Sequence, residues 1–295
     1  MRILITGASG QVGSELVRAW DLHGERDIVV ALNREALDVS DRSAVMERIT
    51  AERPDAVVNC AAKTAVDNCE NDRDGTFSVN TSGTAHLAEA CVGIGAHLTT
   101  ISTDYVFDGT KREPYTESDP TNPLSVYGQS KLAAEKTLHQ ALQAGNTSQG
   151  LSATVVRTSL VFGAYGSNMV KAVLTQLRSG KVLYYVTDLV ACPTSAADLA
   201  SVLLRLTRER VTGLFHVANQ GVVSRFDLAC AVARAAGEDT DRVLPTTTSS
   251  PPQPHAATRP AYSALDCTTL ASTGEPLLRH FTEPLVELVE ELTAC

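Results

Sequence analysis

The order of strand and helix patterns along the chain restricts its fold more than any other sequence feature. Short apolar segments with the character of buried strands cover residues 2–6, 28–32, 54–59, 96–101 and 151–157. Helical patterns lie between them, at residues 11–20, 43–52, 72–95 and 127–144. Strands that are repeatedly followed by helices predict an α/β fold with a parallel, doubly wound sheet of the Rossmann type. Such a sheet binds ligands at the carboxyl ends of its strands.

The first strand runs into a glycine-rich turn, in which Gly7, Gly10 and Gly13 are spaced three residues apart. Glycines between a strand and a helix allow a tight turn and a close approach to a pyrophosphate, whose charge then lies at the helix N-terminus. The spacing is similar to that of the short-chain dehydrogenase/reductase superfamily. Three glycines near a turn also occur by chance, but their place between the first strand and helix predicts dinucleotide binding.

Tyr127 and Lys131 are four residues apart in a helical pattern, so they lie on one face, one turn from each other. An ammonium near a phenol favours the phenolate and lowers a pKa that is ordinarily about 10. The tyrosine would then donate a proton near neutral pH, while Ser102 or Thr103 held a substrate oxygen against it. The alternative is a chance pair on a solvated helix, and only the rest of the chain argues against it.

The end of the second strand bears on the choice of cofactor. Residues 28–32 run into Asn33 and Arg34, where an NAD-preferring protein often carries an acid for the ribose 2′-hydroxyl. Arg34 is therefore either a ligand for the 2′-phosphate of NADPH or a solvated loop residue, and NADH is the second cofactor option. Small residues at 60–64, after the third strand, would let a cofactor lie close to the backbone.

The chain changes in character after Gly163, and its 295 residues are many for one domain but few for two. We therefore expect a dinucleotide-binding domain formed by residues 1–164 with 187–219. A smaller substrate-binding lobe is expected from residues 165–186 with 220–295. The Pro-, Ser- and Thr-rich segment 246–259 is predicted to be a loop within that lobe, because a helical pattern at 281–292 follows it.

Composition narrows the class of protein further. A net charge of −9 and scattered basic residues argue against a nucleic-acid-binding face. The odd number of cysteines, seven, without any Cys-x-x-Cys pair, fits neither a disulfide framework nor a zinc site. No apolar run approaches the ~20 residues that span a bilayer. Since the N-terminus enters a strand directly, we expect a cytoplasmic protein without membrane contact.

Eight segments, taken in order along essentially the whole chain, resemble the dTDP-4-dehydrorhamnose reductase family of extended short-chain dehydrogenases. Two of them are Ser-Thr-Asp-Tyr-Val-Phe-Asp-Gly at 102–109 and the Tyr-Gly-Gln-Ser-Lys that ends 122–131. The others lie at residues 7–13, 37–41, 58–67, 157–159, 193–194 and 259–266. The resemblance implies reduction, with NADPH or NADH, of a ketone on a nucleotide-linked sugar.

Roles for individual residues follow from the resemblance at matching positions. It implies Thr103, Tyr127 and Lys131 as the catalytic set. It implies that the cofactor is bound by Gly7, Gly10, Gln11, Val12, Gly13, Arg34, Asp38, Val39, Ala61, Ala62 and Thr64, with Tyr127 and Lys131 at its nicotinamide end. It further implies that the substrate is bound by Asp104, Tyr105, Leu160, Arg259 and Ser263.

The chain departs from the family pattern at two positions of interest. Leu160 stands where the family usually has tryptophan after Arg-Thr-Ser, and Arg225 replaces a tryptophan near Ser224. Leucine in place of tryptophan at position 160 leaves room and removes an N–H donor, which suggests a sugar other than plain rhamnose. The alternative is that Leu160 packs into the core and does not contact the sugar. Glu15 matches a glutamate that in some relatives binds Mg²⁺ between two copies. A lone carboxylate is more often solvated or ion-paired, so we expect no essential metal.

These observations favour an NAD(P)H-dependent oxidoreductase that reduces the C4 ketone of a dTDP-4-keto-6-deoxyhexose in deoxysugar biosynthesis, as a monomer or homodimer. One alternative is a nucleotide-sugar dehydratase or epimerase, although dehydratases usually carry an acid where this chain has Tyr105. A second is a non-catalytic nucleotide-binding subunit, resembling the methionine adenosyltransferase beta subunit. That role would not require Thr103, Tyr127 and Lys131 together.

Overall fold

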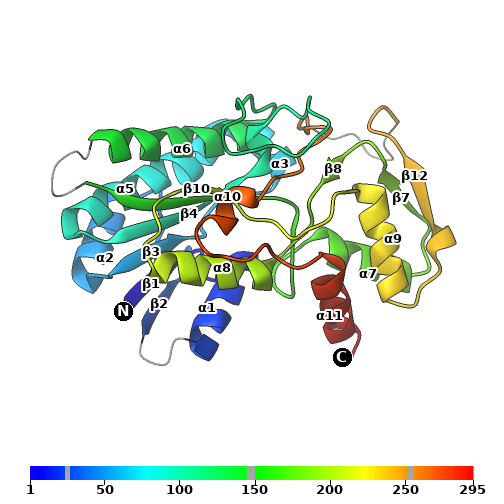
Figure 1. Cartoon of the computed structure of the whole chain (residues 1–295), viewed down its shortest axis with the longest axis horizontal. Helices are drawn as coiled ribbons and strands as arrows, with labels where there is room; N and C mark the ends of the chain where they lie inside the picture. Colours follow the sequence, from blue (N-terminus) through cyan, green and yellow to red (C-terminus); the bar gives the residue numbers. More distant parts are fainter. Residues whose placement is uncertain (24–26, 145–149, 251–255, 295) are drawn as a thin grey trace.

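The computed structural model describes residues 1–23, 27–144, 150–250 and 256–294 (Figure 1). The loop predicted at 246–259 lies partly outside these residues, as does Cys295. A six-stranded sheet forms the centre of the larger part, and all its neighbouring strands are parallel. In spatial order its strands are β10 (Gly213–His216), β5 (Ser152–Thr158), β4 (His97–Thr103), β3 (Ala56–Asn59), β1 (Arg2–Thr6) and β2 (Ile28–Leu32).

The strand order reverses between β1 and β3, because β2 pairs on one side of β1 and β3 on the other. At such a switch point the loops that follow the two strands diverge and leave a crevice at their carboxyl ends. The loops that diverge here are the glycine turn after Thr6 and the segment 60–64 after Asn59. The sheet thus confirms the predicted doubly wound α/β fold.

Helices cover both faces of the sheet (Figure 1). One face packs against α2 (Arg42–Glu52), α5 (Gly83–Ile94) and α6 (Val126–Ala144), with Val57 and Leu98 in its fully buried core. The other packs against α1 (Gln11–His23) and α8 (Ala196–Arg208), where Trp20 and Leu203 are buried. Because both faces are covered, β1, β2 and β3 are apolar over nearly their whole length and do not alternate.

A smaller lobe lies beside the carboxyl edge of the sheet, at the right in Figure 1. It combines the strand pair β7 (Leu183–Val186) and β12 (Val243–Thr246) with α7 (Met169–Arg178), α9 (Arg225–Ala235) and α11 (Thr282–Thr293). These elements share one apolar core, which includes Val173, Leu228 and Leu285. Segments far apart in sequence therefore build this lobe. The division predicted from the sequence stays a proposal, and Leu270 of α10 (Thr268–Ala271) packs with the sheet rather than with the lobe.

Short strand pairs connect the two parts. β6 (Val161–Phe162) pairs with β9 (Thr194–Ser195), and β8 (Val190–Ala191) pairs with β11 (Val223–Ser224). Ser224 caps α9 by a reciprocal bond with Asp227, in which each side chain meets the backbone N–H of the other residue. The cap fixes where α9 begins, and so fixes the position of Arg225, its first residue.

The helix expected over roughly residues 72–95 is present at residues 73–94, but five of its residues form a π-helical turn instead of an α-helical one. That region contains α4 (Arg73–Phe77), a π-helix (Ser78–Ser82) and α5, while α3 (Val66–Asn71) precedes them. Asp72 ends one helix and caps the next, because its carboxylate accepts from the backbone N–H of Gly75. The wider turn at Ser78–Ser82 carries Asn80 inward, where its side chain is fully buried. π-turns of this kind are frequent at functional sites.

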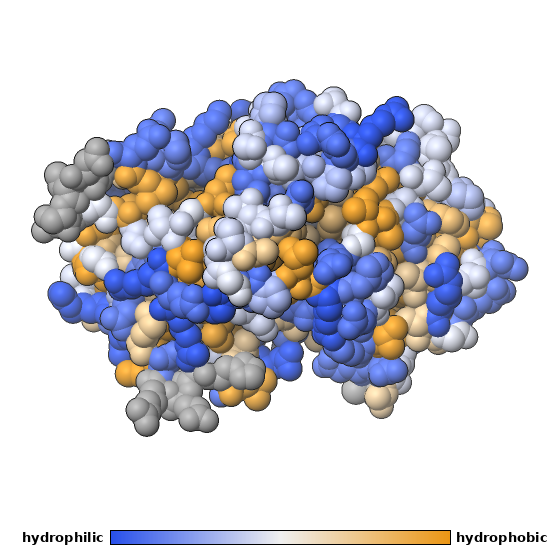
Figure 2. Space-filling model, in the orientation of Figure 1, coloured by the Kyte–Doolittle hydropathy of each residue, from blue (hydrophilic) through white to orange (hydrophobic). Residues whose placement is uncertain are grey.

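The exposed surface is of mixed character. On the face shown in Figure 2, hydrophilic side chains are interspersed with apolar ones. Leu22, Ile28 and Tyr184 are among the exposed apolar residues, and they belong to different elements. None of the described helices is both long and apolar enough to cross a membrane.

Candidate active site

The glycine turn packs directly onto the loop that follows β3. Gly7 has a φ of +63°, and a Cβ there would lie 2.6 Å from the backbone nitrogen of Ala61. A Cβ on Gly13 would collide with the carbonyl oxygen of Gly7. Larger residues would therefore push α1 away from the sheet, so the two glycines set the floor of the crevice.

Two adjoining cavities lie in this crevice, of about 390 and 210 Å³, and they share Gly10, Cys60, Ala61 and Ala62. Of the predicted site residues, the larger is lined by Gly10, Gln11, Val12, Ala61, Ala62, Thr64, Thr103, Asp104, Tyr105, Tyr127, Lys131 and Leu160. The smaller is lined by Gly7, Gly10, Arg34, Asp38, Val39, Ala61 and Ala62. Gly13, Arg259 and Ser263 line neither of the two.

Thr103, Tyr127 and Lys131 meet at the larger cavity. Thr103 is the last residue of β4, and the other two lie one turn apart near the start of α6. The rings of Tyr105 and Tyr127 pack edge to face, with centroids 5.9 Å apart. The side chains of Thr103 and Lys131 are each 5% exposed. Tyr127 and Lys131 therefore lie on the face of α6 that lines the cavity, and not on a solvated face of the helix.

The protonation states differ from those expected from the sequence. Burial raises the pKa of Tyr127, and a hydrogen bond with the Thr103 hydroxyl works in the opposite direction. Burial lowers the pKa of Lys131 to about 8, while Glu135 and Cys60 work to raise it. The expectation that Lys131 makes the phenol more acidic omitted this desolvation. Tyr127 therefore keeps its proton at neutral pH, as a proton donor must.

Glu135, which the sequence analysis missed, lies one turn beyond Lys131 on α6. Its carboxylate accepts from the Arg157 guanidinium at 2.7 Å (Oε2 from Nη2) and at 3.0 Å (Oε1 from Nε), and it also accepts from the Ser102 hydroxyl. The two charged side chains are 10% and 4% exposed. The sequence signal was a charged residue at i+4 from Lys131, on the same helix face.

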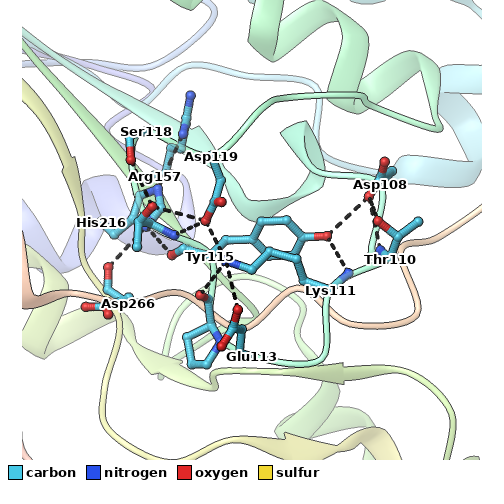
Figure 3. Close-up of polar contacts among 12 residues, drawn as sticks. Asp108, Thr110, Lys111, Glu113, Tyr115, Ser118, Asp119, Arg157, His216 and Asp266 are labelled. Atoms are coloured by element: carbon cyan, nitrogen blue, oxygen red, sulfur yellow. Dashed lines mark hydrogen bonds and ion pairs between the residues drawn. The ribbon is translucent and has the colours of Figure 1, made fainter.

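Arg157 also belongs to a polar network with His216 and Tyr115, which Figure 3 shows beside it. His216 Nδ1 lies 3.0 Å from the carbonyl oxygen of Tyr115 and Nε2 lies 3.4 Å from Arg157 Nη1. A proton on Nδ1 satisfies both contacts, since Nε2 then accepts from arginine. Burial lowers the pKa of His216, with Arg157 acting in the same direction. The ring of Phe107 stacks on Tyr115 at 4.1 Å and lies under the Arg157 guanidinium.

Asp104 is a buried carboxylate next to Thr103. It accepts from Ser159 at 2.7 Å, from Ser263 at 2.6 Å and from Thr103 at 3.0 Å. Burial raises its pKa. The Ser263 hydroxyl thus donates to Asp104, and its expected contact with the substrate stays a prediction.

Tyr105 and Arg259 lie at the outer part of the site. The Arg259 guanidinium donates to Asp67 through Nη2–Oδ2 at 2.7 Å and Nη1–Oδ1 at 3.1 Å. It is also hydrogen-bonded to Tyr105. The ion pair fastens the segment around residue 259 to α3, above Tyr105.

Leu160 combines the two roles left open in the sequence. It lines the larger cavity and packs against the apolar core of the lobe. Its backbone is left-handed, with a φ of 41°, which is uncommon for a residue other than glycine. The neighbouring Thr158 has a buried hydroxyl with no hydrogen-bond partner within the described chain, and it too lines the cavity. Sequence reasoning missed Thr158, because a threonine at a strand end carries no distinctive pattern.

Asn80 has a buried polar role. Its side-chain oxygen accepts from the Lys63 backbone N–H at 2.8 Å, and its amide donates to the Lys63 carbonyl and the Ser130 hydroxyl. It thus clamps the loop after β3 to α6, directly before Lys131.

The smaller cavity is charged at its edge. Arg34 is 78% exposed, and its Nε lies 3.6 Å from Oδ2 of Asp38. Hydrogen bonds from Ser40 hold the pKa of Asp38 below its ordinary value. Arg34 is therefore exposed but lies beside the Asp38 carboxylate, and both residues line the smaller cavity.

Glu15 is buried and pairs with Arg18 of the same helix at 2.8 Å. Within the described ranges, no group of three His, Cys, Asp or Glu side chains is placed to hold a metal ion. An activity without essential metal stays a prediction.

A glycine turn on a parallel sheet, with a partly buried tyrosine and a buried lysine at the carboxyl edge, defines a Rossmann-fold oxidoreductase of the short-chain dehydrogenase/reductase type. The family model for the RmlD substrate binding domain matches residues 1–294. The chain belongs to that family, and the resemblance seen in the sequence is confirmed.

Individual relatives agree with this placement. A dTDP-4-dehydrorhamnose reductase of Mycobacterium tuberculosis is 41% identical over 96% of this chain and 91% of its own length. A probable dTDP-4,6-dihydroxy-2-methyloxan-3-one 4-ketoreductase of Streptomyces antibioticus is 38% identical over 100% and 96%. The crystal structure of dTDP-4-dehydrorhamnose reductase from Bacillus anthracis in complex with NADP aligns with a TM-score of 0.91 at 32% identity, over 98% and 99% of the two chains.

Proposed function

We propose that this protein reduces the C4 ketone of a dTDP-4-keto-6-deoxyhexose with NADPH, in the synthesis of a deoxysugar. The observation that carries the proposal is the meeting of Thr103, Tyr127 and Lys131 in one cavity with the Gly10–Val12 turn. Relatives with reductase names, one solved with NADP, support the same reaction.

The residues of the crevice suit a dinucleotide. Gly10, which lines both cavities, leaves no side chain where a pyrophosphate would approach the start of α1, a helix end that favours negative charge. Gly7 and Gly13 allow the turn to pack closely onto the loop after β3 and onto α1. The unpartnered hydroxyl of Thr158 also leaves a polar group for a ligand in the larger cavity. Arg34, at the smaller cavity, would meet a 2′-phosphate. Bound NADPH supplies the hydride.

The chain's own residues would manage the charge that develops on the ketone oxygen. Thr103 and Tyr127 would hydrogen-bond this oxygen, and Tyr127 would deliver its phenolic proton to it. Lys131 would carry a positive charge near the phenol. The Glu135 carboxylate favours this charged form, because it raises the pKa of Lys131. A positioned proton donor is typically worth about 10²–10⁴ in rate.

The test is consumption of NADPH with a panel of dTDP-4-keto-6-deoxy sugars that includes dTDP-4-dehydrorhamnose. Tyr127→Phe should abolish reduction while NADPH still binds, because only the transferable proton is lost. Lys131→Ala should lose activity and also bind NADPH more weakly. A dehydratase would act without added NADPH, and a regulatory subunit would consume none. Wild-type turnover by Tyr127→Phe would place the proton donor elsewhere.

A further inference from the structure

Arg225 enters the larger cavity from the lobe. It is the first residue of α9, whereas Thr103 and Tyr127 belong to the sheet and to a helix that covers it. Its side chain lines the same 390 Å³ space as theirs. The residue is half-buried, so its guanidinium is partly withdrawn from water.

Within the part of the chain that the structure describes, the Arg225 guanidinium has no hydrogen bond and no ion pair. Every other described arginine that is not exposed, Arg157 and Arg259 among them, donates to a carboxylate. A guanidinium offers five N–H donors, and leaving them unmet in a half-buried place is costly. Arg225 is therefore the exception, and it is placed at the ligand cavity.

Arg225 is close enough to the Asp104 carboxylate to help lower its pKa against the stronger effect of burial. That carboxylate is already engaged, because it accepts from Ser159, Ser263 and Thr103. Asp104 thus attracts Arg225 through space without serving as its hydrogen-bond acceptor. The guanidinium donors of Arg225 are therefore available to a ligand in the cavity.

We propose that Arg225 binds the diphosphate of the nucleotide-sugar substrate, an inference that rests on the proposed function. The diphosphate carries the formal charge of such a substrate, and a single pyranose ring separates it from the ketone carbon. The planar fork of arginine suits two phosphate oxygens at once. The other anion that could enter is the cofactor's pyrophosphate, for which the Gly10–Val12 turn already offers backbone donors.

Binding of dTDP alone and of NADPH alone, each measured by calorimetry, tests the assignment. Arg225→Gln should weaken dTDP binding about 10- to 100-fold, because charge-assisted hydrogen bonds are lost. Arg225→Lys should recover only part of it, since lysine keeps the charge without the fork. NADPH affinity should stay unchanged and the melting temperature nearly so, because the guanidinium makes no hydrogen bond or ion pair in the described part of the unliganded protein and only a through-space interaction with Asp104 is lost. Arg234→Gln, at an exposed arginine of the same helix, is the matched control.

The outcomes separate this inference from the function on which it rests. Unchanged dTDP affinity in Arg225→Gln, with normal binding by the parent protein, overturns the diphosphate assignment alone. Weaker NADPH binding with unchanged dTDP binding would assign Arg225 to the cofactor instead. A parent protein that neither binds dTDP nor reduces any sugar of the panel overturns both.

Discussion

Replacing Glu135 with glutamine should weaken both the fold and the function of Lys131, because one carboxylate serves both. Glu135 pairs with Arg157 in a place where the two side chains are 10% and 4% exposed, and it raises the pKa of Lys131. Glutamine keeps the shape and one acceptor oxygen but removes the charge. Arg157 would then remain buried without a counter-charge.

The stability loss can be worked from this geometry. Breaking a buried ion pair by removing one partner costs about 3–5 kcal/mol. Because glutamine still accepts from Ser102 or Arg157, we expect the lower end, about 3 kcal/mol. At roughly 2–4 °C per kcal/mol for a chain somewhat smaller than this one, the melting temperature should fall by roughly 6–12 °C.

The effect of the substitution on the pKa of Lys131 has a definite direction. Its pKa in the folded protein is about 8, below its ordinary value, so the ammonium is lost as pH rises through about 8. NADPH binding that depends on this ammonium should therefore weaken above that pH. Without the carboxylate of Glu135 the ammonium is less favoured, and the same weakening should begin at a lower pH than in the parent.

Melting curves and NADPH affinity from pH 6 to 9.5 measure the two effects. Glu89→Gln is the matched control, because Glu89 pairs with Arg42 on the surface, where both side chains are about half exposed. It should leave the melting temperature and the pH profile nearly unchanged. A Glu135→Gln protein that melts within 2 °C of the parent and keeps its pH profile would refute the reasoning.

Three further substitutions or treatments test the remaining assignments. Arg34→Ala should lower NADPH affinity by about 1.5–3 kcal/mol and spare NADH, since a charge-assisted contact to the 2′-phosphate is lost; equal loss for both cofactors would make Arg34 structural. Leu160→Trp should slow the reduction of the natural substrate while sparing the reduction of dTDP-4-dehydrorhamnose. Parallel losses on both sugars, with about 1–3 kcal/mol of destabilisation in a melting curve, would show core overpacking instead. Activity should survive treatment with EDTA, and a complete loss that Mg²⁺ alone restores would contradict the assignment of Glu15 to an ion pair with Arg18.

The sequence predicted the sheet, and the shared helix face of Tyr127 and Lys131, because both depend on local spacing. Periodicity located the strands to within a residue or two, and four residues on a helix place Tyr127 above Lys131 whatever the tertiary context. The helix expected over roughly 72–95 is present, but its π-helical turn at Ser78–Ser82 was not predicted. The buried bonds of Asn80 to Lys63 and Ser130 lie in this turn, and hydrophobic periodicity does not report them.

Other features depend on which distant groups meet, and no local pattern reports them. The burial that raises the pKa of Tyr127 comes from the assembled cavity. The use of Ser263 as a donor to Asp104 joins residues 159 positions apart. Arg34 borders the smaller cavity, and its role toward the cofactor stays a prediction, while its contact with Asp38 depends on the fold of the loop between them.

The carboxylate of Asp104 also sets a condition on the length of chain that can form a working site. Asp104 directly follows β4, yet one of its hydroxyl donors is Ser263, and the backbone N–H of Ser263 itself bonds to Val190. A chain that has been synthesised only through β10, which completes the sheet, therefore has Thr103 beside an acid that lacks one of its donors. Deletions from the C-terminus that reach residue 263 should accordingly abolish turnover outright rather than lower it by degrees, even where the sheet itself still forms.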